Sequence, residues 1–176
     1  MRRKKRSYAN RGMQLEREID VSNKAYERKG VGLIKKLPTP VHIHSTRGSR
    51  VSGVLQKGEL VDYIGMSQGA AIAFDAKQTR GKSLPLSNIP SHQYKFLKGW
   101  HDNGGVAFLV VRFTDERKTF FYPFSRIKYW KEEQNERKSI PIADAEEHGV
   151  EIKSKHGVVL DYLSAVQEEV RREEED

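Results

Sequence analysis

The sequence contains no cysteine among its 176 residues. It therefore has no thiolate ligand for zinc, no cysteine nucleophile and no disulfide framework, and its length suffices for one domain with its own core. No stretch approaches the roughly 20 apolar residues that span a bilayer, and no apolar block follows the basic start as in a secretory signal. We expect a soluble, cytoplasmic protein with no membrane partner.

Positive charge is the main excess in the composition. The net charge is +8, and residues 166–176 alone hold six acidic and two basic side chains, so the remaining chain is more strongly basic. Such a surplus favours a polyanionic partner, above all nucleic acid, because cations that neutralise phosphates release condensed counterions. The alternative is a solubility surplus spread over the surface.

Composition divides the chain into three parts. Residues 1–11 hold cations and almost nothing apolar, which predicts a disordered basic arm. Residues 12–165 carry the apolar patterns of a single domain. Residues 166–176 are predicted to form an acidic C-terminal tail.

Apolar periodicity predicts helices and strands in an order typical of an α/β fold with a mixed sheet flanked by helices. Ser91 is expected to begin and cap the second helix, just after Pro90. The expected helices are 13–30, 91–103, 125–131 and 158–171, and the expected strands are 31–37, 71–77, 106–113 and 119–124.

Residues 41–60 alternate between apolar and polar side chains and are broken by glycines. They also contain Arg47, Arg50 and Lys57. This pattern indicates a projecting hairpin with a basic surface, although a long loop is a competing interpretation. His42 and His44 have a spacing that could bind a transition metal, but no third ligand is near in sequence, so a basic surface is the favoured interpretation.

Two aspartates and a lysine form the candidate catalytic group. Asp62 precedes the turn-like Gly65, and Asp75 and Lys77 share one face of the strand 71–77, about 7 Å apart at about 3.3 Å per residue. Carboxylates are the ligands that magnesium prefers, and magnesium suits phosphodiester hydrolysis. The lysine would orient water or stabilise the developing phosphorane charge. An exposed ion pair is the alternative.

Several motifs occur together in a fixed order over roughly residues 10–130. The combination resembles the PD-(D/E)xK nuclease superfamily and, within it, the RecU-type Holliday junction resolvases. Three positions depart from the family pattern: Leu37 stands where a lysine is usual, Asp75 replaces a glutamate, and Leu60 replaces a threonine. The motifs are Asn10–Glu16 (NRGMQLE), Lys36–Val41 (KLPTPV), Asp62–Gly65 (DYIG), Phe74–Thr79 (FDAKQT), Leu84–Ile89 (LPLSNI) and Ser91–Gln93 (SHQ).

The resemblance implies a restriction-endonuclease-like fold, a single nuclease domain at 12–165 and a stalk at 41–60. It implies magnesium, with manganese as a substitute, and a homodimer that makes paired nicks in four-way DNA junctions, with a recombinase or branch-migration machinery as a further partner. The resemblance implies that the catalytic residues are Lys77, Asp62, Asp75 and Glu16. It implies that the metal ligands are Asp62, Asp75 and Gln93. The implied DNA contacts are Arg11, Arg47, Arg50 and Lys57.

Alternatives remain for these assignments. Gln93 could cap a helix or face solvent, and Glu16 could pair with a nearby lysine or arginine. A nuclease of the same fold without junction preference is one rival function. A DNA-binding recombination accessory with a decayed site is the other, and the retained Asp62, Asp75 and Lys77 argue against it.

Overall fold

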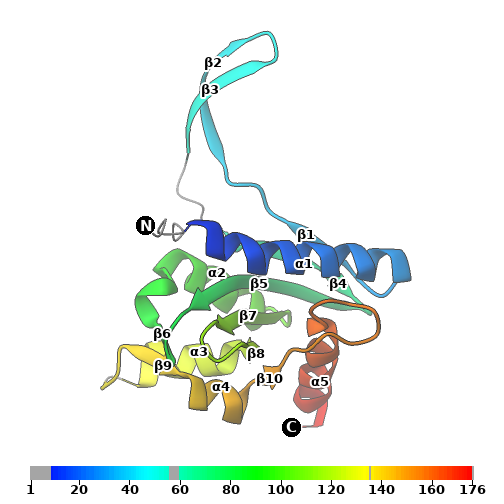
Figure 1. Cartoon of the computed structure of the whole chain (residues 1–176), viewed down its shortest axis with the longest axis vertical. Helices are drawn as coiled ribbons and strands as arrows, with labels where there is room; N and C mark the ends of the chain where they lie inside the picture. The colour runs from blue at the N-terminus through cyan, green and yellow to red at the C-terminus, as the bar shows by residue number, and fades with distance from the viewer. Residues whose placement is uncertain (1–8, 56–59, 135, 176) are drawn as a thin grey trace, which may run out of the picture.

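The computed structural model describes residues 9–55, 60–134 and 136–175. Its centre is a six-stranded sheet in the order β1-β4-β5-β7-β8-β10 (Figure 1). Only the β5–β7 pair is parallel among these neighbours, so the sheet is mixed as expected. The strands are β1 (Leu33–Lys36), β4 (Tyr63–Ser67), β5 (Ala70–Thr79), β7 (Val106–Phe113), β8 (Lys118–Pro123) and β10 (Val150–Glu151).

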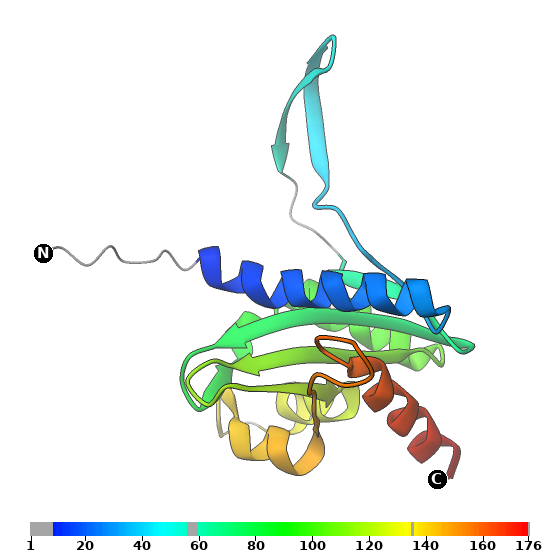
Figure 2. The same cartoon turned by 45° about the vertical axis from the view of Figure 1, so that its right-hand side comes forward.

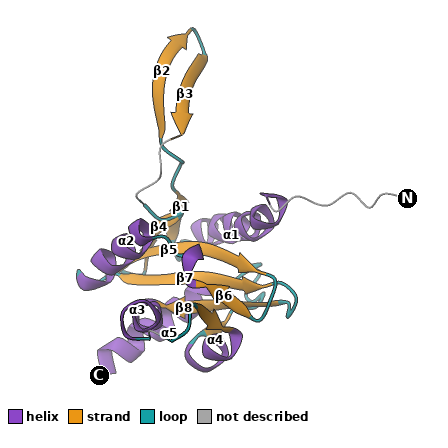
Figure 3. Cartoon of the chain, turned by 90° about the vertical axis from the view of Figure 1, so that its left-hand side faces the viewer, coloured by secondary structure: helices purple, strands orange, loops and turns teal. Residues whose placement is uncertain are grey.

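Helices cover both faces of this sheet. On one face, α1 (Ala9–Lys29) and α5 (Tyr162–Glu175) pack on Phe74 and Phe108. On the other, α2 (Ser91–Asp102), α3 (Phe124–Lys128) and α4 (Ile142–His148) pack on Ala73 and Leu109 (Figure 3). Alternation along β5 and β7 sends successive side chains into the two clusters, so both central strands are buried on both faces. The expected α/β fold is confirmed.

The parallel pair requires a crossover connection, because a tight turn joins only antiparallel strands. The chain leaves β5, forms β6 (Ser83–Pro85) and the 3-10 turn Leu86–Asn88, and then enters α2, which lies between β5 and β7 in sequence. A second small sheet pairs β6 with β9 (Ser139–Pro141). The crossover therefore brings the start of α2 near the second half of β5.

A two-stranded hairpin projects from the body. It consists of β2 (Val41–Arg47) and β3 (Arg50–Leu55), and every side chain in it is exposed. Figure 2 shows this hairpin standing away from the sheet and from α1. The hairpin interpretation of this segment therefore holds over the long loop, and we call residues 41–55 the stalk.

A backbone hydrogen bond joins the two ends of the segment that carries the stalk, residues 37–62. Leu37 N–H donates to the carbonyl oxygen of Asp62 at 2.8 Å, so the chain returns to the point where it left. Asp62 is the last residue before β4, and Leu37 directly follows β1. The two strands on either side of the excursion are antiparallel neighbours in the main sheet.

Some boundaries differ from the expectations. Ala9–Arg11 already belong to α1, and the rest of the expected basic arm lies outside the described residues. Residues 166–175 continue α5, and Val166 is buried, so the acidic segment starts within the folded unit. The expected helix 125–131 is α3 followed by the π-helix Tyr129–Glu133. Of the described helices, none is long and apolar enough to cross a membrane.

The expected cap at Ser91 is wrong. Pro90 is the N-cap residue, in an extended conformation, and no side chain caps this helix end. The carbonyl oxygen of Pro90 accepts the Tyr94 N–H at 3.0 Å, which makes Ser91 the first helical residue. Its hydroxyl is one position too late in the chain to receive the orphan N–H groups of the first turn.

Candidate active site

Strands β4 and β5 bring the two aspartates together. Tyr63 pairs with Phe74 in the antiparallel register, so Asp62 lies opposite Asp75 just beyond that pair. The Asp62 carboxylate accepts the backbone N–H of Ala76 at 3.4 Å, which orients it toward β5. The two carboxylates therefore share one place on the sheet, although thirteen residues separate them in sequence.

Lys77 lies between the strand and α2. Its Nζ is 2.8 Å from Asp75 Oδ1 and donates to Gln93 Oε1, also at 2.8 Å. The Lys77 side chain is only 14% exposed, so this is not the solvent-facing ion pair of the alternative interpretation. Gln93, in the first turn of α2, neither caps the helix nor faces only solvent. Its side-chain oxygen accepts a hydrogen bond from the ammonium, which also pairs with Asp75.

Asp75 is fully buried and short of hydrogen-bond donors. Both of its carboxylate oxygens are shielded from solvent, and Lys77 Nζ lies 2.8 Å from Oδ1. Burial raises the pKa of Asp75 to about 7, Lys77 acts in the opposite direction, and the neighbouring Asp62 raises it further. Two close carboxylates with open oxygens are a donor set that fits a divalent cation.

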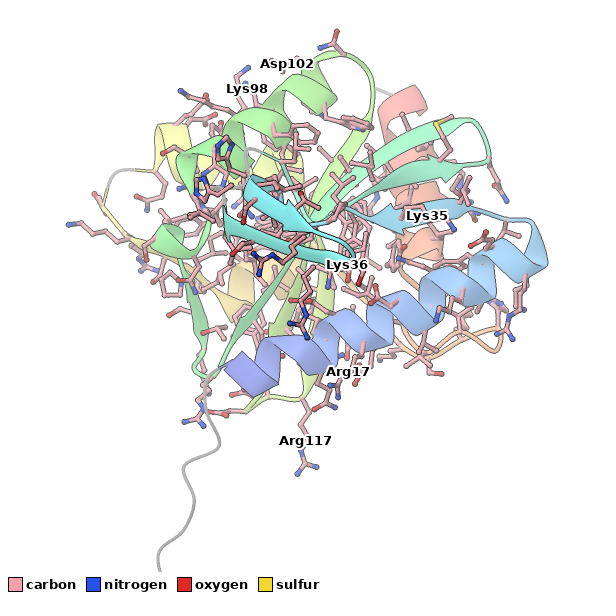
Figure 4. All side chains as sticks on the ribbon, turned by 90° about the horizontal axis from the view of Figure 1, so that it is seen from above. Arg17, Lys35, Lys36, Lys98, Asp102 and Arg117 are labelled. Carbon is pink, nitrogen blue, oxygen red and sulfur yellow. The ribbon has the colours of Figure 1, made fainter. Side chains whose placement is uncertain are left out.

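Glu16 faces the same region from α1. Its carboxylate pairs with Lys36 Nζ at 2.5 Å, which is the pairing that the alternative interpretation described. Burial lowers the pKa of Lys36, but Glu16, Asp20 and Asp62 outweigh burial and leave the pKa raised. Lys36 therefore lies among three carboxylates, one of which is Asp62. Seen from above, Lys36 lies between α1 and the base of the stalk (Figure 4).

Sequence reasoning missed Lys36 and Asp20 as neighbours of the site. Asp20 accepts the Tyr63 hydroxyl at 3.0 Å, and Tyr63 directly follows Asp62. The signal for Lys36 was its place in the motif Lys36–Val41, immediately before the point where the chain leaves β1. Asp20 gave no signal, because an acidic residue on an amphipathic helix is ordinarily a solvated one.

The expected DNA contacts lie apart from the carboxylates. Arg47 and Arg50 pair across the tip of the stalk, and both are exposed. Arg11 belongs to α1, but its side chain lies outside the described part of the structure, and so does the whole of Lys57. The rings of His42 and His44 are 5.0 Å apart on the stalk, and the described residues hold no group of three or more His, Asp or Glu arranged for a metal.

The fold and the site define a class. A mixed sheet between helices, with two aspartates and a lysine meeting at its central strands, is the α/β arrangement that the sequence motifs predict. The chain belongs to the RecU family, because the family model described as Recombination protein U matches residues 10–168. The resemblance seen in the sequence is thereby confirmed.

Individual relatives agree with this assignment. A Holliday junction resolvase RecU from Staphylococcus epidermidis is 35% identical over 178 residues, covering 96% of this chain and 86% of the relative. A Staphylococcus aureus protein of the same name has the same identity and coverage. A 1.6 Å structure of Archaeoglobus fulgidus Hjc, a Holliday junction resolvase, is 13% identical with a TM-score of 0.49, covering 79% of this chain and 94% of that one.

Proposed function

We propose that this protein is a Holliday junction resolvase, an endonuclease that makes paired nicks in four-way DNA junctions during recombination and repair. The observation that carries the proposal is Lys77, held between Asp75 and Gln93 beside Asp62, in a chain whose 35% identical relatives bear that name. The buried lysine and the carboxylate pair form a compact polar site of the kind that phosphodiester hydrolysis requires.

Asp62 and Asp75 would hold a divalent cation, magnesium first and manganese as a substitute. When bound, the cation supplies charge neutralisation at the phosphate and a more acidic water. Gln93 offers a side-chain oxygen to the same place, but that oxygen accepts a hydrogen bond from Lys77. We therefore assign Gln93 first to positioning the lysine, with metal ligation as its second role.

Lys77 acts directly on the substrate in this proposal. Its ammonium has further N–H donors beyond the one directed at Gln93, and these can bind a phosphate oxygen as negative charge develops. Its pairing with Asp75 also favours the ionised carboxylate, opposing the burial that raises the pKa of Asp75. Glu16 borders the site from α1, and its contact with Lys36 connects it to Asp62.

The substrate and the assembly follow from the reaction. A four-way junction is two-fold symmetric, so two symmetric cuts require two copies of the site, which a homodimer supplies. The stalk, with Arg47 and Arg50, would contact junction phosphates together with Arg11 at the start of α1 and with Lys57, which follows the stalk in sequence. The exposed arginine pair at the stalk tip supports this placement.

The test compares a four-way junction with a linear duplex of the same sequences, in magnesium, at matched protein concentration. We expect paired nicks in opposing strands of the junction and little cutting of the duplex. Asp75→Asn should lower cleavage by orders of magnitude while junction binding survives, since the change preserves shape and removes the charge that holds the cation. Calcium should support binding with little cutting, and manganese should partly rescue the variant.

Asp102→Asn is the matched control, because Asp102 is exposed, paired with Lys98 on α2 and far from Asp75 in the fold. It should cleave as the parent does. If Asp75→Asn cuts junctions as fast as the parent, the proposed site is wrong and the accessory protein becomes the better interpretation. Equal cutting of junction and duplex would indicate the less selective nuclease instead.

A further inference from the structure

The π-helix Tyr129–Glu133 contacts the segment that leads into α2. Lys131 Nζ donates to the carbonyl oxygens of Leu86 and Ile89, at 3.0 and 2.7 Å. The next residue, Glu132, accepts the hydroxyl of Tyr94 at 2.6 Å. Two consecutive side chains of one short element thus bind the chain on both sides of the point where α2 begins.

The contacts of Lys131 are unusual for a lysine. Its ammonium is partly buried, and its two hydrogen bonds go to the backbone carbonyls of Leu86, the first residue of the 3-10 turn Leu86–Asn88, and of Ile89, the residue just after it. Burial lowers the pKa of Lys131, so the environment disfavours the charged form. The charge-assisted hydrogen bonds to the two carbonyls hold the ammonium at this position and fix the turn. A lysine in a surface salt bridge, or one that only faces solvent, would need neither this partial burial nor two carbonyl acceptors. The contacts of Lys131 therefore indicate a structural role.

Tyr94 anchors the other side of the start of α2. The Tyr94 hydroxyl donates to the Glu132 carboxylate, which connects the first turn of α2 to the π-helix. Its ring stacks on Phe124, whose α3 directly precedes the π-helix. Figure 3 shows α2 and α3 on the same side of the sheet. The first turn of α2 is therefore fixed from one structural unit, residues 124–133.

The fixed segment contains the residue that reaches the active site. Gln93 lies between Ile89 and Tyr94 in sequence, and its Oε1 accepts the Lys77 ammonium at 2.8 Å. A shift of the first turn of α2 would lengthen this hydrogen bond, because Gln93 reaches Lys77 from the helix and Lys77 is anchored on β5. π-helices are rare and are often found at functional sites.

We propose that Lys131 and Glu132 are positioning residues that set the start of α2 and thereby place Gln93 against Lys77. The catalytic consequence rests on the proposed resolvase function, whereas the positioning itself can be measured without any substrate. Neither residue contacts the reacting groups, so their effect is exerted through Gln93 alone.

Lys131→Met tests the first contact, since methionine keeps an unbranched chain of similar length and removes all three donors. Lys131→Arg restores a cation that can reach both carbonyls. Lys128→Met is the matched control, because Lys128 is an exposed lysine in the adjacent α3. Tyr94→Phe removes only the hydroxyl bound to Glu132, and it keeps the test available if Lys131→Met folds poorly.

Amide hydrogen exchange of the full chain without metal or DNA gives the primary readout. The Ile89 and Tyr94 N–H groups are bonded to Leu86 and Pro90 carbonyls and report on this segment. In Lys131→Met they should exchange about tenfold faster, while amides of β7 and β8 keep the parent rate. Lys131→Arg and Lys128→Met should match the parent. Tyr94→Phe should affect mainly the first turn of α2.

Cleavage gives the second readout. Lys131→Met should lower kcat on four-way junctions about tenfold with junction Kd unchanged, as for other residues that orient a catalytic group, and Lys131→Arg should recover it. Unchanged exchange at residues 86–95 in both Lys131→Met and Tyr94→Phe overturns the proposal. If the parent protein does not cut junctions, the proposed function is wrong. The exchange measurement still tests whether Lys131 and Glu132 position the start of α2.

Discussion

At the scale of single residues, the candidate site depends on one ammonium with two partners. Lys77 is anchored on β5, paired with Asp75 and hydrogen-bonded to Gln93, and Asp62 borders the same carboxylate. Because Lys77 is already held in one position, it loses little side-chain conformational entropy on binding phosphate. A lysine on an open surface would lose more. In the proposed reaction, the lysine would therefore be preorganised for a charge that appears only as the phosphate reacts.

Lys77→Ala is expected to lower kcat about a hundredfold, because a positioned cation at developing negative charge contributes on the order of 3 kcal/mol. Junction Kd should change little, since one cation among many phosphate contacts contributes modestly to binding. Single-turnover cleavage with saturating protein, beside a filter-binding or mobility-shift Kd, separates the two quantities. A loss confined to binding, with the rate at saturation intact, would contradict the assigned role.

The sequence predicted part of this site. Alternation along a strand puts Asp75 and Lys77 on one face, and the structure keeps both there. The contact with Gln93 could not be derived from spacing, because it depends on how the crossover helix packs on β5. Lys131 was beyond sequence reasoning altogether, since its partners are backbone carbonyls and any residue types at positions 86 and 89 would present them.

At the scale of elements, the stalk is the part of the structure that contributes least to the stability of the fold. Its strands bury no side chain, and Arg47 faces Arg50 directly across the hairpin. Like charges opposite each other in an antiparallel pair are unfavourable, so the folded protein alone gains nothing from this pair. A polyanion bound at the tip would remove the repulsion, in agreement with the proposed contact to DNA.

Changing Arg47 and Arg50 together to alanine should weaken junction binding and reduce the preference for junction over duplex. The melting temperature should stay within a degree or two, since exposed cations contribute little to folding. Arg172→Ala, in α5 and away from the stalk in Figure 1, is the control for removing an arginine. A large drop in melting temperature would make the arginine pair structural instead.

The β1–β4 pair at the base of the stalk depends on close backbone approach at Gly65. A Cβ at this position would lie 2.3 Å from the Leu33 carbonyl oxygen and 2.6 Å from the Ile34 Cα. Neither backbone atom can move without opening the pair, so Gly65→Ala should lower the free energy of unfolding by about 2 kcal/mol or more. Chemical denaturation of the metal-free protein measures this difference.

Gly99→Ala is the matched control for that substitution. Its Cβ would meet nothing within 4 Å, and the residue lies inside α2, where alanine is a better helix former. We expect this variant to gain about 0.5–1 kcal/mol. Equal effects of the two substitutions would show that packing at Gly65 is looser than the structure indicates.

The long elements were predictable and the short ones were not. The strand expected at 106–113 coincides with β7, because eight nearly continuous apolar residues need two covered faces. β9, α4 and β10 were missed, since two to seven residues provide too little periodicity to detect. The two strands are regular structure only through their pairing, β9 with β6 and β10 with β8.

At the scale of the whole molecule, the buried carboxylate of Asp161 connects the loop before α5 to α1. Asp161 accepts hydrogen bonds from Tyr26 on α1 and from Ser164, and its other contact is His156. Burial raises the pKa of Asp161, but these hydrogen bonds outweigh burial and leave the pKa lowered. The loop before α5 is thus tied to α1 by an ionised group.

This arrangement predicts an acid-sensitive fold. Because the pKa of Asp161 is lower in the folded state than in the unfolded chain, its contribution to stability is present above the ordinary aspartate pKa near 3.8 and is lost as pH falls through the lowered value. Asp161→Asn should lower the unfolding free energy by about 1–3 kcal/mol at pH 7 and flatten its decline below about pH 4. Urea unfolding between pH 3 and 7 checks both effects.

The hydrogen bond from Leu37 to Asp62 has an evolutionary consequence. The excursion that carries the stalk starts and ends at one point of the sheet, and the stalk strands share no core residue with the body. An insertion of this kind can lengthen, shorten or be exchanged between genes without rebuilding the catalytic unit. Natural variants are therefore expected to diverge most in stalk length and tip sequence, so that substrate preference changes while the chemistry is inherited intact.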